Sequence, residues 1–313
     1  MLKRKALRKI FMATLSVFIA LVIYIIPNKI STNVIYTNKE IEFIKKETYH
    51  KIYLLNDDNF LVEHKILIEN MNDVDKIKCI ISNLMISNKK NPDNLKGLIP
   101  VETKLLSIDV RNNIIHLNFS KELLNISEEI EESLIESLVY SLCNIKNIKG
   151  LSIYVEGNTL EKTPSGKNSL PPILNKSYGI NKIYNLSNNK DIIRTDLYYV
   201  TKINNQNYYV PVTKYMNDDR NKIEIIIESL TSNYIYENNL MSFLNKNIKL
   251  NSYKIDEGIF VLELNDKIFS NKFDIKEEVE YTLMQSVFNS YDVDSVLLLV
   301  KGMNFSKKYT RSN

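Results

Sequence analysis

The hydrophobic positions of this chain form a pattern that runs from Lys51 to Gly157 and returns about 145 positions later, ending at Gly302. Alternating or continuous apolar runs predict strands, and apolar residues three or four positions apart predict helices. The first copy therefore predicts strand, strand, helix, strand, strand, helix and strand. Its predicted strands span 52–55, 60–68, 105–110, 114–119 and 151–155.

Two amphipathic helices are expected in this copy. We expect Asp73 to cap the first, and Ser127 to open the second, whose four early glutamates suit the positive end of the helix dipole. Their apolar stripes are Val74, Ile77, Ile80, Ile81 and Leu84, and then Ile130, Leu134, Ile135, Leu138, Leu142 and Ile145. Asn-rich segments at 56–59 and 111–113 predict tight turns, because Asn tolerates left-handed backbone.

The second copy repeats this order with strands at 197–200, 208–212 and 296–300, a hairpin across 255–258, and helices through 223–230 and 275–289. Matching positions include Tyr53 and Tyr198, Leu138 and Leu283, Ser141 and Ser286, and Val155 and Val300. A period of this length means duplicated whole domains, since solenoid repeats are only about 20 to 50 residues long.

The predicted fold class is α+β: two tandem homologous domains, each a small sheet with two helices on one face, after an N-terminal transmembrane helix. The domains span 51–157 and 194–305, and a polar C-terminal tail spans 306–313. The Pro/Asn-rich interdomain segment, 158–193, contains three prolines that oppose regular elements, but its apolar residues predict that it lies against the domains and limits their relative motion.

The first 50 residues predict membrane attachment. Residues 1–9 are a basic tail, 10–27 a transmembrane signal anchor, and 28–50 a juxtamembrane spacer. The apolar run is at the short end of what spans about 30 Å of hydrocarbon. A cleaved secretory signal is the alternative, and it would normally carry small residues after the apolar run, where this chain has Ile25-Ile-Pro-Asn-Lys-Ile30. Basic residues that flank a membrane span tend to stay in the cytoplasm, so the basic tail predicts a cytoplasmic N-terminus and two extracytoplasmic domains.

Charge excludes one class of partner. The net charge is +4, from 41 basic and 37 acidic residues, and five of the bases lie in the first nine positions. Without those five, 36 bases face 37 acids, so the rest of the chain is almost neutral. A nucleic-acid binder needs a clustered basic face to neutralise phosphates. We therefore expect no nucleic-acid partner.

Candidate metal sites are weak. His50, His64 and His116 have no metal-ligand spacing, and Val261 stands where His116 has its counterpart. We expect His116 to face solvent from a strand. The short acidic runs at 57–58 and 217–220 lack the frame of a calcium loop.

Candidate catalytic residues are equally weak. Glu128-Glu-Ile-Glu-Glu132 is expected to be a solvated helix start rather than a pair of catalytic carboxylates. Ser165-Gly166 lacks a nucleophile elbow, and no phosphate-binding glycine loop occurs. We expect no catalytic, cofactor-binding or metal-binding residue, no cofactor and no enzymatic activity.

Other residues favour contacts with proteins. Cys79 and Cys143 are expected to be free thiols, although a bridge between them stays open. Tyrosines cluster at 198–199, 208–209, 234 and 236. Most are expected to be half-buried in strands, but such amphipathic aromatic residues also suit a protein partner.

Four segments carry a family resemblance: 52–62 (Ile-Tyr-Leu-Leu-Asn-Asp-Asp-Asn-Phe-Leu-Val), 98–108, 113–120 and 155–157. In their order and spacing, they make the chain similar to the GerM family of bacterial sporulation and germination proteins, whose mature part is two tandem GerMN domains. Two features depart from the family pattern. The second copy lacks the turn Ile99-Pro-Val-Glu-Thr103, and no cysteine follows the apolar run closely enough for lipid attachment.

The resemblance implies a non-enzymatic extracytoplasmic scaffold that assembles or localises a membrane complex between mother cell and forespore, with other sporulation membrane proteins as partners. The alternative is a module that binds or processes peptidoglycan in germination. Processing would need two convergent carboxylates about 5 to 9.5 Å apart, and no such pair is expected. A receptor for a small molecule between the two domains is a third interpretation. The partner, the oligomeric state and the compartment stay open.

Overall fold

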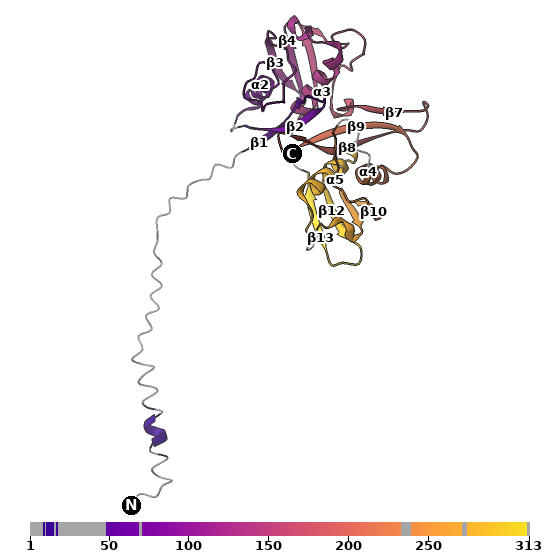
Figure 1. Ribbon diagram of the computed structural model, residues 1–313. Helices are drawn as coiled ribbons and strands as arrows, with labels where there is room; N and C mark the ends of the chain where they lie inside the picture. The colour runs from indigo at the N-terminus through magenta and orange to yellow at the C-terminus, as the bar shows by residue number, and fades with distance from the viewer. Residues whose placement is uncertain are drawn as a thin grey trace, which may run out of the picture. The chain divides into compact units, whose positions relative to one another are not determined.

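The computed structural model describes residues 9, 11–15, 17, 48–68, 71–232, 239–270 and 274–311 (Figure 1). The chain divides into two units, Met1–Lys46 and Glu47–Asn313. In the first unit the described residues are helical. Most of the predicted basic tail, membrane anchor and spacer lies outside the described residues. Across the described parts, no helix combines the length and apolar character needed to cross a membrane.

The first copy begins with an antiparallel hairpin of β1 (Tyr49–Leu55) and β2 (Leu61–Leu67), followed by α2 (Asp73–Asn83). A four-stranded sheet then has the order β3-β4-β5-β6. Its strands are β3 (Leu105–Arg111), β4 (Ile114–Phe119), β5 (Gly150–Val155) and β6 (Asn158–Thr159). Strands β4 and β5 are parallel, and the connection between them contains the short 3-10 helices η1 (Lys121–Leu124) and η2 (Glu128–Ile130) and then α3 (Glu131–Leu142).

The second copy has the same plan. Its hairpin is β8 (Ile192–Ile203) and β9 (Gln206–Asn217), and α4 (Lys222–Thr231) follows. Its four-stranded sheet has the order β10-β11-β12-β13. The elements are β10 (Leu250–Asp256), β11 (Ile259–Leu264), η4 (Asp266–Ile268), α5 (Glu277–Ser290), β12 (Ser295–Val300) and β13 (Ser306–Thr310).

The duplication extends to the strand register. In the first copy Ile114 pairs with Gly150, and in the second the matching Ile259 pairs with Ser295. Strands β3 and β10 even share a register shift, after Leu105 and after Leu250. The repeat predicted from apolar positions is therefore a repeat of the backbone. The seven predicted elements of each copy occur in the predicted order, and an additional strand follows them, β6 in the first copy and β13 in the second.

One sheet with two helices on one face was the wrong arrangement for each copy. Each copy instead has a hairpin and a separate mixed sheet, and the second hairpin gains a third strand, β7 (Ile183–Asn185), beside β9. Helix α3 packs on both β1 and β5, and α5 packs on both β8 and β12. These helices therefore lie between the two sheets of their copy, because each carries apolar side chains toward both.

Three local predictions were also wrong. Asn72, not Asp73, caps α2, and its side chain accepts a hydrogen bond from the Asp75 N–H at 2.9 Å. Residues 306–310 are not a tail but strand β13, which pairs with β12. The prolines of the interdomain segment do not exclude regular elements, since β6, the 3-10 helix η3 (Lys176–Tyr178), β7 and the start of β8 lie within it.

Candidate functional site

The two hairpins lie against each other along β2 and β9 (Figure 1). Asn181 of the interdomain segment connects them. Its side-chain amide donates to the carbonyls of Leu61 at 2.8 Å and Pro211 at 2.7 Å, and its side-chain oxygen accepts from the Leu61 N–H at 2.9 Å. Pro211 has no N–H of its own, so its carbonyl is the group available there. The segment thus lies against both copies, as expected; its effect on their relative motion stays a prediction.

Asn181 is itself held by α3. Its backbone N–H donates to the carboxylate of Glu136 at 2.8 Å, and Lys182 lies 3.4 Å from the same carboxylate. Burial raises the pKa of Glu136 to about 7, although Lys182 and the Asn181 hydrogen bond act in the opposite direction. A negative charge on Glu136 is therefore costly, and the surrounding donors only partly offset that cost.

A buried polar network joins the copies beside Asn181. Tyr281 of α5 donates its hydroxyl to the Glu63 carboxylate, 2.6 Å from each oxygen, and accepts from the Lys51 ammonium at 2.7 Å. Lys51 also forms an ion pair with Glu63 at 3.4 Å, and the Glu63 side chain is only 2% exposed. Tyr209 stacks on the Tyr281 ring with centroids 3.8 Å apart. Burial, and then the Glu63 charge, raise the pKa of Tyr281 far above its usual range.

Equivalent residues of the two copies meet at this contact. Tyr53 and Tyr198, which match in the repeat, line the same cavity between the copies. Each also donates its backbone N–H to a helix serine, Tyr53 to Ser141 at 3.0 Å and Tyr198 to Ser286 at 2.9 Å. Contacts between matching positions are typical of a two-fold relation. The Ser and Tyr residues that the two copies share therefore have a structural role, because each pair joins the hairpin of its copy to a helix.

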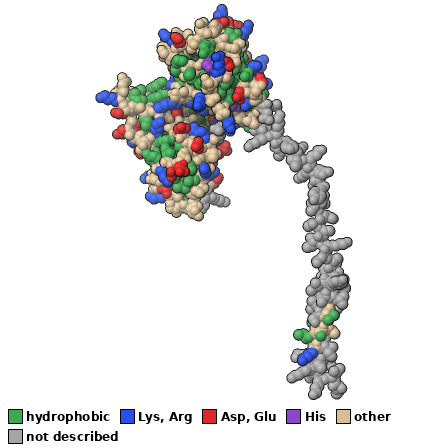
Figure 2. Space-filling model, turned by 180° about the vertical axis from the view of Figure 1, so that it is seen from behind, with side chains coloured by type: hydrophobic (Ala, Val, Ile, Leu, Met, Phe, Trp, Pro, Cys, Tyr) green, Lys and Arg blue, Asp and Glu red, His purple; other side chains and the backbone are tan. Residues whose placement is uncertain are grey.

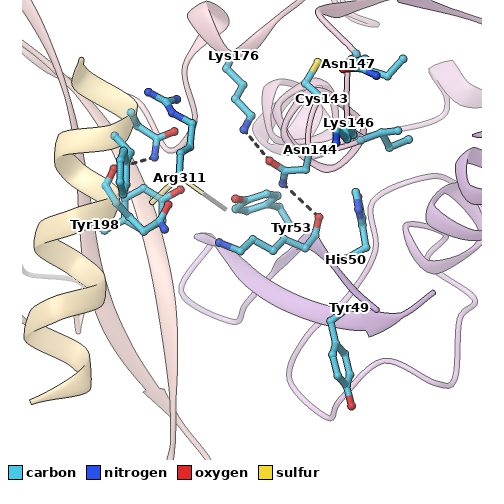
Figure 3. Close-up of a pocket in the computed structure, with 16 residues that line it drawn as sticks. Tyr49, His50, Tyr53, Cys143, Asn144, Lys146, Asn147, Lys176, Tyr198 and Arg311 are labelled. Atoms are coloured by element: carbon cyan, nitrogen blue, oxygen red, sulfur yellow. Dashed lines mark hydrogen bonds between the residues drawn. The ribbon is translucent and has the colours of Figure 1, made fainter. Parts of the chain in front are cut away.

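A pocket of about 370 Å³ lies beside this tyrosine pair and is lined by both copies and by the interdomain segment (Figure 3). Asn144 and Asn289, another matching pair, lie on its walls. Five basic residues also line it. The basic residues are His50, Lys51, Lys146, Lys176 and Arg311.

Burial shifts several pKa values in this pocket. The pKa of Lys176 is lowered to about 8, chiefly by burial and in addition by the charges of neighbouring Lys51 and Arg311. Burial raises the pKa of the Cys143 thiol to about 11, against the charge of Lys176. It also lowers the pKa of His50, although the ring bonds to the Ser141 carbonyl at 2.8 Å. A low-dielectric environment disfavours the charged form of each group.

The histidines and cysteines do not converge. His50 lines the pocket. His116 lies on β4, where it alternates with the buried Ile115 and Leu117 and so faces away from the core, as expected; it is half-buried, and its Nδ1 lies 3.4 Å from the Tyr154 hydroxyl. Cys79 and Cys143 are free, as predicted. In the described ranges, no three His, Cys, Asp or Glu side chains gather as metal ligands would.

The acidic helix start differs from its prediction at one residue. Glu131 is only 2% exposed and accepts hydrogen bonds from the N–H and the hydroxyl of Ser165, both at 2.7 Å. Burial alone would raise the pKa of Glu131, but the hydrogen bonds from Thr163 and Ser165 hold it below its usual value. Ser165 and Glu131 thus fix the interdomain segment to α3. The acidic residues at 57–58 and 217–220 lie in separate loops.

The tyrosine clusters have different positions. Tyr198 and Tyr199 are buried, and Tyr208 and Tyr209 are half-buried on β9, whereas Tyr234 and Tyr236 lie outside the described residues. Sequence reasoning missed the pocket, Lys176 and Arg311. The one signal of the pocket in the sequence is the matching pair Asn144 and Asn289. Their match alone does not show that the two copies meet at these residues.

The fold and its repeat agree with known proteins. A family model described as "Germane: Sporulation and spore germination" matches residues 51–161 and 196–305. The spore germination protein GerM of Bacillus subtilis (strain 168) is 25% identical over 221 residues, which are 67% of this chain and 60% of that protein. The chain thus spans 60% of the length of that relative. A solved structure of the tandem GerMN domains of the B. subtilis sporulation protein GerM aligns with a TM-score of 0.74 at 22% identity, covering 82% of this chain and 92% of that one.

Proposed function

Because the chain belongs to the Germane family of sporulation and spore germination proteins, we propose that it is a non-enzymatic scaffold outside the cytoplasm. In this role it assembles or localises a membrane protein complex between mother cell and forespore. Its contacts are with other sporulation membrane proteins. The observation that carries the proposal is that both family matches fall on copies with the same exposed sheet edge.

Those edges are β3 and β10, which end their four-stranded sheets and, among the described residues, pair with a strand on one side only. Each edge exposes a large apolar side chain, Leu106 at 48% and Ile255 at 52%. An unpaired strand edge is a template for another chain, and main-chain hydrogen bonds with side-chain contacts give such pairing affinity and specificity. Both copies therefore offer an unpaired strand at the same place in the sheet. The exposed apolar side chain lies at a different position along each strand, since Leu106 corresponds to Asn251 and Ile255 to Val110.

The charges on the surface are compatible with a protein that binds other proteins. Basic and acidic side chains are interspersed over the face seen in Figure 2. We extend the proposal to the N-terminus, where the apolar run 10–27 after a basic tail anchors the chain in the membrane with both copies outside.

Deletion of residues 47–313 tests the role in cells. The scaffold proposal expects misplaced partner proteins and fewer mature spores. Normal spores with correctly placed membrane proteins in the deletion strain would contradict it.

A second experiment addresses the peptidoglycan alternative. The full chain in non-ionic detergent is incubated with purified peptidoglycan. We expect neither soluble fragments nor saturable co-sedimentation, and either result would favour a cell-wall function instead.

Edge substitutions test the contact itself. Leu106→Lys and Ile255→Lys place a charge on each edge, which opposes strand addition. We expect the double variant to lose its partner in pull-downs from sporulating cells. Val74→Lys on α2, where Val74 is 38% exposed, is the matched control and should keep the partner. Equal recovery with all three substitutions would refute contact through the edges.

A further inference from the structure

The pocket between the two copies carries an unbalanced positive charge. Four cations line it, Lys51, Lys146, Lys176 and Arg311, and no Asp or Glu does. The charge of Lys51 is compensated by an ion pair with Glu63, which does not line the pocket. No described residue forms an ion pair with the other three. A cavity lined by one sign of charge concentrates ions of the opposite sign.

Lys176 is held in place by both copies. Its backbone carbonyl accepts from the Tyr140 hydroxyl at 3.0 Å and from the Arg194 guanidinium at 2.9 Å. Its ammonium donates to the Asn144 side-chain oxygen at 2.6 Å (Figure 3). A surface lysine normally keeps its freedom and its hydration. This one is oriented into a cavity, where an amide oxygen is the single hydrogen-bond acceptor that the described residues provide.

Arg311 is oriented in a similar way from the second copy. Its Nε donates to the Val293 carbonyl at 3.0 Å and its Nη2 to the Tyr291 carbonyl at 2.8 Å, while the guanidinium lies 5.5 Å from the Phe288 ring centre. The segment that follows each copy thus contributes one cation to the pocket. These cations are Lys176 after the first copy and Arg311 after the second.

We propose that this pocket binds a small polar molecule through an oxyanion group, a carboxylate or a phosphate, held by Lys176 and Arg311. Lys146 lies exposed at the rim, and the amides of Asn144 and Asn289 provide hydrogen bonds to the rest of the molecule. The volume of about 370 Å³ is within the range of about 300 to 1,000 Å³ that is usual for small-molecule sites. The inference does not rest on the scaffold role.

The pH dependence of binding follows from Lys176. Burial lowers the pKa of Lys176 to about 8, and a bound anion would favour the charged form and raise it. The charged or titratable groups around this ammonium are His50, Lys51, Glu63, Cys143 and Arg311. Binding should therefore weaken as the pH rises above about 8 and Lys176 loses its charge.

Isothermal titration calorimetry on the full chain in non-ionic detergent at low salt tests the proposal. The probes are citrate for carboxylates, pyrophosphate for phosphates, and glucose as a neutral control. We expect citrate or pyrophosphate to bind and glucose not to bind. Loss of one charged hydrogen bond in Lys176→Met should weaken binding about tenfold or more. Asn289→Asp, which adds a negative charge without removing a cation, should also weaken it.

Lys149→Met is the control, because Lys149 is exposed but does not line the pocket, and it should bind as the original chain does. Circular dichroism establishes that each variant is folded. If Lys176→Met does not fold, Asn289→Asp carries the test. Binding by neither anion would overturn the proposal, as would unchanged binding in both pocket variants or an equal loss in Lys149→Met.

Discussion

Removal of one hydroxyl group should loosen the contact between the two copies. The Tyr281 hydroxyl is the only group that bonds to both Glu63 and Lys51 in the described network. Tyr281→Phe leaves the Glu63 carboxylate, 2% exposed, with Lys51 at 3.4 Å. The ring remains, so stacking on Tyr209 is kept and no cavity forms.

The expected cost follows from the kind of bond that is lost. A hydrogen bond to a charged group contributes about 1.5 to 3 kcal/mol, and a buried group left unsatisfied adds to the loss. We expect Tyr281→Phe to lower the free energy of unfolding by about 2 to 3 kcal/mol. For a unit of the size of Glu47–Asn313, that corresponds to a fall in melting temperature of about 4 to 5 °C.

Tyr209→Phe is the matched control. The Tyr209 hydroxyl makes no hydrogen bond to any residue that the structure describes, so its loss should change stability by less than about 0.5 kcal/mol. Chemical denaturation followed by circular dichroism measures both variants. A fall in stability in Tyr281→Phe no larger than in Tyr209→Phe would refute the role of the Glu63–Tyr281–Lys51 network.

Three further changes test other parts of the structure. Lys176→Met should stabilise the anion-free protein at pH 7 by up to about 3 kcal/mol, since ionised Lys176 has a pKa of about 8 rather than 10.5; no gain in urea denaturation would contradict this. Glu136, with its pKa raised to about 7, should make stability fall as the pH rises from about 4.5 to about 7; an unfolding series that shows the same fall in Glu136→Gln would contradict the assignment. Gly97→Ala should cost about 1 to 3 kcal/mol or more, because its Cβ would lie 2.3 Å from the Leu84 carbonyl oxygen; a melting temperature equal to that of the original chain would disprove the clash.

Local patterns were enough to predict the element order. The apolar stripe of α3 and the Asn112–Asn113 turn, with φ of 52° and 65°, depend on neighbours in sequence. The repeat predicted that both copies would share their elements, and even the Ser141 and Ser286 hydrogen bonds follow it. Secondary structure and duplication are therefore accessible from sequence.

Residues whose partners lie far away in sequence could not be predicted. Strand β13 is polar apart from Tyr309, whose hydroxyl bonds to Glu280 at 2.7 Å, so no apolar period marks it. Glu131 looks like its solvated neighbours until Ser165 covers it. The pocket requires the contact between copies, which apolar patterning does not specify.

The scaffold that we propose contacts other proteins in the sporulating cell through the strand edges β3 and β10. The most direct measurement replaces Leu106 or Ile255 by a photoreactive amino acid in the full chain, irradiates sporulating cells and identifies what is attached. We expect covalent attachment of membrane proteins from both edge positions, and none when Val74 is replaced in the same way. Peptidoglycan fragments attached in their place, or no attached protein from either edge, would contradict the proposal.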